Sequence, residues 1–270
     1  MSAPRVLIAG SGDLGRRIAA RLRGAGASVV SVARRPRPDE PDLIALDLTQ
    51  PVSGRLPDAF DVLVHCLAPA TRDEAAYRAV YVDALRHVLD AVPGARRLVF
   101  VSSTAVYGDH GGARVDESAA CRPGEFNGRV LLAAEELARS CGRDALVLRL
   151  GGLYGPGREM LLRRVRSGEP LPVSEPPLYS NRIHIDDAAA AASHLITQSA
   201  AGTFNLVDDC NAPQPDVLDW LADRLQWPRL ARVAGPVPAE NKRVDNGRLR
   251  GTGFRFDYPD YLTGYDALLR

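Results

Sequence analysis

The sequence is nearly devoid of lysine. Lys242 is the only one, although lysine and arginine together number 34 among 270 residues. Arginine keeps its proton under all ordinary conditions, so it supplies positive charge but cannot relay protons as lysine can. Any reaction that requires a lysine in this chain therefore depends on Lys242 or does not take place.

Cysteine and long apolar runs are also scarce. The four cysteines have no C-x-x-C spacing, which favours a reduced, cytoplasmic protein without a structural metal. No apolar stretch is long enough to cross a bilayer, and the first residues lead directly into a predicted strand, so we expect neither a membrane partner nor a signal peptide. The net charge of +1 gives no general attraction to nucleic acid.

A glycine-rich turn is the most informative motif that is present. An apolar run at residues 6–9 is followed at once by a G-x-G-x-x-G segment and then by a helical pattern. The turn consists of Gly10, Ser11, Gly12, Asp13, Leu14 and Gly15. A second apolar run at 28–32 completes a strand–helix–strand unit, the context in which such glycines bind the diphosphate of a dinucleotide at a helix N-terminus. The alternative, a turn that needs glycine only for tight packing, is less favoured.

The residues after the second strand indicate which dinucleotide is bound. NAD sites place an acidic residue there for the ribose hydroxyls, whereas NADP sites use arginine for the 2′-phosphate. Here Ala33 stands at the acidic position, and Arg34 and Arg35 follow it. We therefore predict NADP(H) in preference to NAD, with a solvated arginine-rich loop as the alternative.

Strand and helix patterns alternate along the first half of the chain. Strands are expected at 43–46, 61–67, 97–101 and 145–150, and helices at 72–91 and 125–140. This alternation predicts an α/β fold with a Rossmann-type doubly wound parallel sheet. Because ligands bind at the carboxyl ends of such strands, the glycine turn, Asp47, Ala68 and Ser103 should line one crevice.

Several motifs together resemble the extended short-chain dehydrogenase/reductases of the NAD(P)-dependent epimerase/dehydratase type. They are the glycine turn, 47–49, 101–108, 149–157 and 182–187. The resemblance implies an NAD(P)-binding domain at 1–150 and a region at 151–270 that completes the sheet and forms a small C-terminal substrate lobe. The family's usual glycine pattern is G-x-x-G-x-x-G, and Ala9 stands at its first glycine. The resulting G-x-G-x-x-G pattern resembles that of the family's atypical branch.

The resemblance also implies roles for single residues. The glycines would hold the diphosphate, Asp47 and Leu48 would lie against the adenine, and Leu67 and Ala68 would contact the nicotinamide-side ribose. Ser103 falls at the family's catalytic serine or threonine, and Tyr154 would shape the substrate side.

The family's Tyr-x-x-x-Lys pair is missing. In that pair lysine lowers the pKa of the tyrosine, which exchanges a proton with the substrate. Phe126 and Val130 occupy the two positions here, and Tyr81 replaces the family's helix asparagine. The candidates for the proton donor are Tyr81, Tyr107, Tyr154 or water.

Two functions remain open at this stage. The first is an NADP(H)-dependent oxidoreductase or a sugar-nucleotide epimerase or dehydratase relative, which acts on a hydroxyl or carbonyl of a small molecule, as a possible homodimer. The alternative is a catalytically silent dinucleotide-binding sensor or partner-binding protein. We also expect Asp186 or Asp187 to cap a helix.

Overall fold

The computed structural model describes residues 3–40, 42–57, 59–234 and 240–270. Contacts between residues group the chain into two compact units, each built from three stretches of sequence. The first unit comprises residues 1–106, 125–149 and 189–204, and the second comprises 107–124, 150–188 and 205–270. The units therefore interleave along the chain, and the single domain boundary at residue 150 stays a prediction.

A seven-stranded sheet in the order β11-β7-β5-β4-β1-β2-β3 forms the centre of the first unit. Its strands are β1 (Arg5–Ala9), β2 (Ser28–Ala33), β3 (Ile44–Ala45), β4 (Val62–His65), β5 (Arg97–Ser103), β7 (Asp144–Leu150) and β11 (Gly202–Leu206). Strand β1 runs parallel to both β2 and β4. The order starts at β1 and extends in both directions, which confirms the predicted doubly wound Rossmann-type topology.

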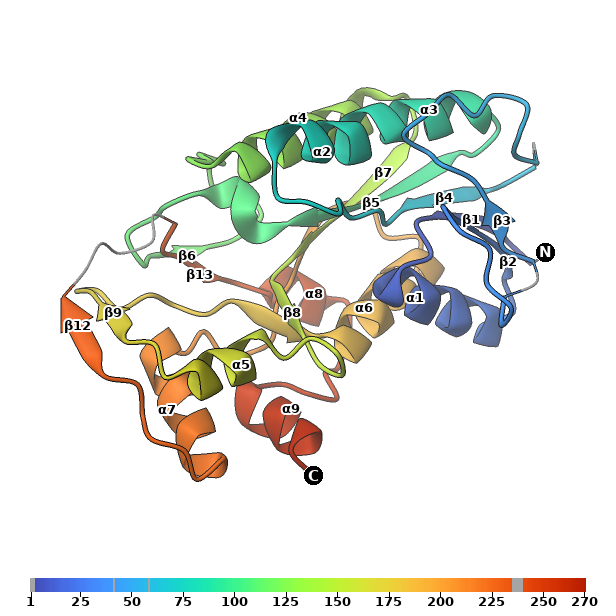
Figure 1. The fold of residues 1–270 in the computed structure, drawn as a ribbon. Helices are drawn as coiled ribbons and strands as arrows, with labels where there is room; N and C mark the ends of the chain where they lie inside the picture. Colours follow the sequence, from blue (N-terminus) through green and yellow to red (C-terminus); the bar gives the residue numbers. More distant parts are fainter. Residues whose placement is uncertain (1–2, 41, 58, 235–239) are drawn as a thin grey trace. The chain divides into compact units, whose positions relative to one another are not determined.

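Helices cover both faces of this sheet. Figure 1 shows α2 (Glu74–Arg78), α3 (Ala84–Ala91) and α4 (Phe126–Ser140) on one face and α1 (Asp13–Gly24) on the other. Helix α1 buries Leu14, Ile18 and Leu22 at helical spacing. It ends where Gly26 adopts a positive φ of 89°, a conformation that favours glycine.

The helix predicted over 72–91 differs from the observed one in its middle. Asp73 accepts a hydrogen bond from the backbone N–H of Ala76 and starts α2. A π-helical turn, η1 (Ala79–Asp83), then joins α2 to α3. Such a turn inserts a residue into the helix without interrupting it, so the apolar pattern alone does not reveal it.

The second unit contains three pairs of short parallel strands. The pairs are β6 (Arg114–Val115) with β13 (Arg243–Val244), β8 (Gly152–Tyr154) with β10 (Arg182–His184), and β9 (Leu171–Val173) with β12 (Arg232–Ala234). Its further elements are α5 (Met160–Ser167), α7 (Gln214–Arg224), α8 (Gly247–Gly251) and α9 (Tyr261–Leu268), and α6 (Ile185–Thr197) starts in it. Strands of two or three residues are too short to give a clear periodic signal in the sequence.

A buried ion pair links three elements of the first unit. Glu135 of α4 is fully buried and receives two hydrogen bonds from Arg149 of β7, at 3.0 Å from Nε and 2.7 Å from Nη2. Ser102 of β5 donates to the same carboxylate at 2.7 Å. Burial alone would raise the pKa of Glu135, but the hydrogen bond and charge of Arg149 outweigh it, so the pKa lies below its usual value.

We expect Glu135→Gln to destabilise the protein, because it leaves the buried Arg149 guanidinium uncompensated. The loss should be about 3–5 kcal/mol in the free energy of unfolding at pH 7, measured by urea denaturation. Since folding lowers the pKa of Glu135, its ionised carboxylate stabilises the wild type at neutral pH, and this stabilisation is lost as the pH falls below about 4.5. The difference in stability between the wild type and Glu135→Gln should therefore shrink in acid.

Arg139→Gln is the matched control for this substitution. Arg139 contacts the same carboxylate at 2.6 Å but is more than a third exposed, so its loss should cost less than about 1 kcal/mol. Equal destabilisation by the two variants would contradict the role given to the buried pair.

Candidate functional site

The glycine turn between β1 and α1 is built on close backbone contacts. Gly10 has a φ of 110°, and a Cβ placed there would lie 2.5 Å from the carbonyl oxygen of Cys66. A Cβ at Gly15 would collide with the carbonyl oxygen of Gly10. Only glycine fits at these two positions, because the turn packs directly against the end of β4 and against itself.

Gly12 differs from the other two glycines. It is exposed, and apart from its chain neighbours no atom of the described residues lies within 4 Å of a Cβ placed on it. It precedes the first residue of α1 and provides no side chain to cap that helix. The turn therefore presents an open helix N-terminus, where backbone N–H groups and the helix dipole favour an anion.

The register of the sheet brings the other predicted cofactor residues to the same edge. Ala9 is paired with Val32 of β2 and with His65 of β4, and His65 is paired in turn with Phe100 of β5. Every one of these strands runs parallel, so their carboxyl ends lie along one edge. That edge leads into Ser11, Asp13, Leu14, Arg34, Arg35, Asp47, Leu48, Leu67, Ala68 and Ser103.

Asp47, which follows β3, lies within the electrostatic influence of Arg34. Asp47 accepts hydrogen bonds from the backbone and the hydroxyl of Thr49, at 3.0 and 2.8 Å. These bonds, with a smaller contribution from the charge of Arg34, lower the pKa of Asp47. Arg34 and Arg35 are both exposed, whereas Leu48 is buried. The guanidinium groups are therefore accessible to a ligand beside the end of β2.

Arg37 and Glu40 contact the glycine turn, which the sequence patterns did not predict. Arg37 Nη1 lies 3.0 Å from Glu40 Oε1 and donates to Ser11 Oγ at 3.2 Å. Ser11 Oγ donates to Glu40 Oε2 at 3.0 Å. The segment after β2 thus returns to the glycine turn. The only sequence signal was the spacing of three residues between Arg37 and Glu40, which occurs often in exposed loops.

Ser103 is partly exposed at the end of β5. Its hydroxyl accepts a hydrogen bond from the N–H of Ala105 at 3.2 Å and retains its capacity to donate. Leu67 is partly exposed and Ala68 is exposed beyond the end of β4. The three residues are thus at least partly exposed at this edge of the sheet, and their ligand contacts stay a prediction.

Two of the three candidate tyrosines are committed to internal hydrogen bonds. Tyr154 is only 3% exposed, donates to the carbonyl oxygen of Asp260 at 3.3 Å and stacks on Tyr265 at 4.7 Å. Tyr107 is fully buried and donates to Asn205 Oδ1 at 2.7 Å. This geometry supports packing roles for both, so the substrate role of Tyr154 stays a prediction without a contact to support it.

Asp186 and Asp187, the residues expected to cap α6, lie in the first turn of that helix, which begins at Ile185. The carboxylate of Asp187 accepts the backbone N–H groups of Asp257 and Tyr258, at 3.0 and 2.8 Å, and so holds the C-terminal segment. The N–H of Asp186 instead donates to His184 Nδ1 at 3.3 Å. His184 therefore serves the first turn of the helix, a use of histidine that the Asp-Asp pattern concealed.

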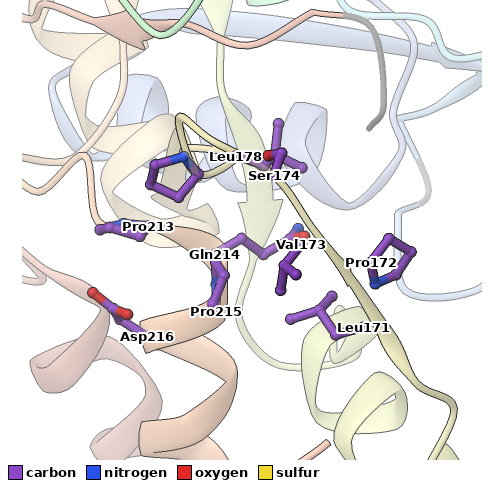
Figure 2. Close-up of a pocket in the computed structure, with 10 residues that line it drawn as sticks. Leu171, Pro172, Val173, Ser174, Leu178, Pro213, Gln214, Pro215 and Asp216 are labelled. Atoms are coloured by element: carbon purple, nitrogen blue, oxygen red, sulfur yellow. The ribbon is translucent and has the colours of Figure 1, made fainter. Parts of the chain in front are cut away.

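A groove of about 390 Å³ lies in the second unit. Figure 2 shows it between β9 with the loop that follows it and the first turn of α7. Its lining residues are Leu171, Pro172, Val173, Ser174, Pro177, Leu178, Pro213, Gln214, Pro215 and Asp216. The lining is mainly apolar, with Ser174, Gln214 and Asp216 as its polar groups.

The described residues contain neither a cluster of metal-ligating side chains nor a membrane-spanning helix. Across the described parts of the chain, no three histidine, cysteine, aspartate or glutamate residues lie close enough to hold a metal ion. None of the described helices has the length and apolar character required to cross a membrane.

Comparison with known proteins agrees with this architecture. The model of the NAD dependent epimerase/dehydratase family matches residues 6–206, well over half of the sequence. The chain belongs to this family. The match includes the glycine turn and every strand end at the candidate site. It also includes Phe126 and Val130, which stand where the family has its tyrosine and lysine.

Three proteins are similar to this chain over most of its length. A putative NAD-dependent epimerase/dehydratase from Methylobacillus flagellatus is 34% identical, with a TM-score of 0.84 and coverage of 99% of this chain and 98% of that one. A 3-diazoavenalumate denitrifying reductase from Streptomyces is 32% identical over 87% of this chain and 83% of its own. Protein YeeZ of Escherichia coli K12 is 30% identical over 67% of this chain, and the match spans 66% of the length of YeeZ.

Aromatic side chains surround the position of the missing family tyrosine. Helix α4 begins at Phe126, whose ring meets the ring of Tyr77 edge-on at 5.3 Å. Tyr77 lies 5.5 Å from Tyr81, and Val130 is buried. Burial raises the pKa of Tyr81 well above its usual value. Tyr81 therefore stays protonated and can donate a hydrogen bond, but it is unsuited to act as a base at neutral pH.

Proposed function

We propose that this protein binds NADP(H) and acts as an oxidoreductase or epimerase-like enzyme on a hydroxyl or carbonyl of a small substrate, without the family's Tyr-x-x-x-Lys pair. The observation that carries the proposal is the open position of Gly12, between two glycines that backbone contacts make obligatory. A turn of this kind leaves room for a diphosphate against the N-terminus of α1.

The residues along the sheet edge fit the remaining parts of a dinucleotide. Gly12 and the first turn of α1 would hold the diphosphate, and Asp47 and Leu48 would lie against the adenine. Leu67 and Ala68 would contact the nicotinamide-side ribose through their backbone. The exposed guanidinium groups of Arg34 and Arg35 would meet the 2′-phosphate.

We also propose that the protein prefers NADP(H) over NAD(H). Ala33 provides no carboxylate for the ribose hydroxyls, and Arg34 follows it directly at the end of β2. Arginine binds phosphate in a planar, two-pronged geometry and stays charged. The family's description names NAD, so the chain's own residues are the basis for this preference.

We propose that Ser103 contacts the substrate. A bound nicotinamide would supply hydride-transfer chemistry. The Ser103 hydroxyl would donate a hydrogen bond to the oxygen whose charge changes during the reaction, which is electrostatic stabilisation rather than proton transfer. The name of the Streptomyces relative, a denitrifying reductase, favours reduction over epimerisation.

Gly12→Ala tests the binding site directly. The new methyl group meets open space in the protein but would occupy the place of the diphosphate, so NADPH affinity should fall at least about tenfold with little change in melting temperature. Gly24→Ala is the matched control, because it makes the same substitution in open space at the far end of α1 and should leave NADPH affinity unchanged. If wild-type protein binds neither NADPH nor NADH in a fluorescence titration, the proposed function fails.

Arg34→Ala tests the preference for NADP(H). Loss of the guanidinium should weaken NADPH about tenfold or more and leave NADH nearly unchanged, because only NADPH carries the 2′-phosphate. Arg21→Ala, which removes an exposed arginine from the last turn of α1, serves as the control for net charge. Equal weakening of NADPH and NADH by Arg34→Ala would contradict the assignment.

A catalytically silent dinucleotide sensor is the second candidate, because Phe126 and Val130 stand where the family has its tyrosine and lysine. Turnover of NADPH with a panel of carbonyl compounds and nucleotide sugars separates the two functions. If an activity is found, Ser103→Ala should reduce kcat about 100-fold while NADPH affinity is preserved. NADPH binding without turnover on any member of the panel would favour the sensor.

A further inference from the structure

Three side chains from two stretches of the sequence form a closed set of hydrogen bonds on the glycine turn. Ser11 Oγ donates to Glu40 Oε2 at 3.0 Å, and Arg37 donates to Glu40 Oε1 at 3.0 Å. Arg37 also donates to Ser11 Oγ at 3.2 Å. Ser11 is buried, and the side chains of Arg37 and Glu40 are only 29% and 17% exposed. The set is therefore an organised structure and not a chance surface contact.

The backbone places this set beside the end of β2. The N–H groups of Gly10 and Ser11 both donate to the carbonyl oxygen of Val32, at 3.1 and 2.9 Å. The Ser11 side chain consequently lies next to the strand end from which Arg34, Arg35 and Arg37 follow. This is the neighbourhood to which the proposed function assigns the 2′-position of the adenosine ribose.

The chemistry of the set is that of an anion site that already holds an anion. A guanidinium and a hydroxyl converge on one carboxylate, and both are donors that a phosphate monoester uses. The carboxylate belongs to Glu40, so the protein itself occupies these donors. A ligand phosphate could use the same donors only by displacing the Glu40 carboxylate or by binding close to it against the repulsion of the two negative charges.

We propose that Glu40 competes with the 2′-phosphate of NADP(H) for Arg37 and Ser11, and thereby sets how strongly the protein prefers NADP(H) over NAD(H). This inference rests on the proposed dinucleotide function. In this arrangement Arg37 is a second phosphate-binding arginine beside Arg34, and it stays paired with Glu40 until a phosphate displaces that carboxylate. NAD(H) has a neutral 2′-hydroxyl, which does not repel Glu40 and can donate a hydrogen bond to its carboxylate.

The adenosine half of the cofactor is sufficient to test this competition. Adenosine 2′,5′-bisphosphate and 5′-AMP differ only in the 2′-phosphate, and their dissociation constants can be measured by calorimetry. Glu40→Gln keeps the size and hydrogen-bonding capacity of the side chain but removes its charge. We expect it to tighten adenosine 2′,5′-bisphosphate about tenfold, on the order of one charge–charge interaction in partly exposed surroundings, and to leave 5′-AMP within about twofold or slightly weakened.

Asp39→Asn is the matched control. It removes the same charge from the neighbouring residue, which is exposed and pairs with Arg16 at 3.9 Å instead of with the glycine turn. It should change both ligands by less than about twofold. Arg37→Gln should weaken adenosine 2′,5′-bisphosphate and should abolish the gain from Glu40→Gln when the two substitutions are combined, because the liberated partner is then absent.

The outcomes separate this inference from the proposed function. If wild-type protein binds NADPH or NADH, but Glu40→Gln leaves the affinity ratio of the two adenosine ligands unchanged, the competition is disproved and the dinucleotide function stands. The same conclusion follows if Glu40→Gln and Asp39→Asn change the ratio equally. If wild-type protein binds no dinucleotide at all, both proposals fail.

Discussion

The arrangement of the first unit depends on one steric constraint, the approach of the glycine turn to the backbone at the end of β4. Gly10 lies so close to the carbonyl of Cys66 that any side chain would collide with it, and Gly15 packs in the same way against Gly10. These contacts place the first turn of α1 directly above the sheet edge. Because the neighbouring strands run parallel, the segments that follow β2, β3, β4 and β5 begin at that same edge. The open position at Gly12 is a result of this close packing.

Arginine performs the structural work of positive charge in this chain. Arg149 forms a two-pronged pair with a buried glutamate, and Arg97 donates to the backbone carbonyls of Leu195 and Ile196 near the end of α6. A planar group with five donors suits such sites better than an ammonium group does. Lys242 is itself buried, and its Nζ donates to the carbonyl of Gly108 at 3.0 Å. The single lysine is thus occupied by a structural contact.

The absence of the tyrosine and lysine bears on catalysis and not on dinucleotide binding. The sheet edge depends on backbone shape and on charge, and neither depends on Phe126 or Val130. Of the tyrosines considered as proton donors, Tyr107 and Tyr154 form internal hydrogen bonds. Tyr81 lies in an aromatic cluster where burial disfavours its ionised form. The same burial disfavours Tyr81 as a proton donor, because giving up its proton would leave a buried tyrosinate.

The sequence by itself determined the class of the fold, the strand–glycine–helix turn and the lack of the Tyr-x-x-x-Lys pair, because these are local patterns that read directly as strands, helices and motifs. The π-helical turn, the pairing of the short strands and the role of His184 were not predictable, since they leave no periodic signal. Only the tertiary structure decided that Glu40 and Arg37 return to Ser11, which lies 29 and 26 positions earlier, and that Tyr154 is covered by Tyr265. The physical reason is that contacts between distant residues depend on the path of the intervening loops, and a sequence pattern describes only what neighbours along the chain have in common.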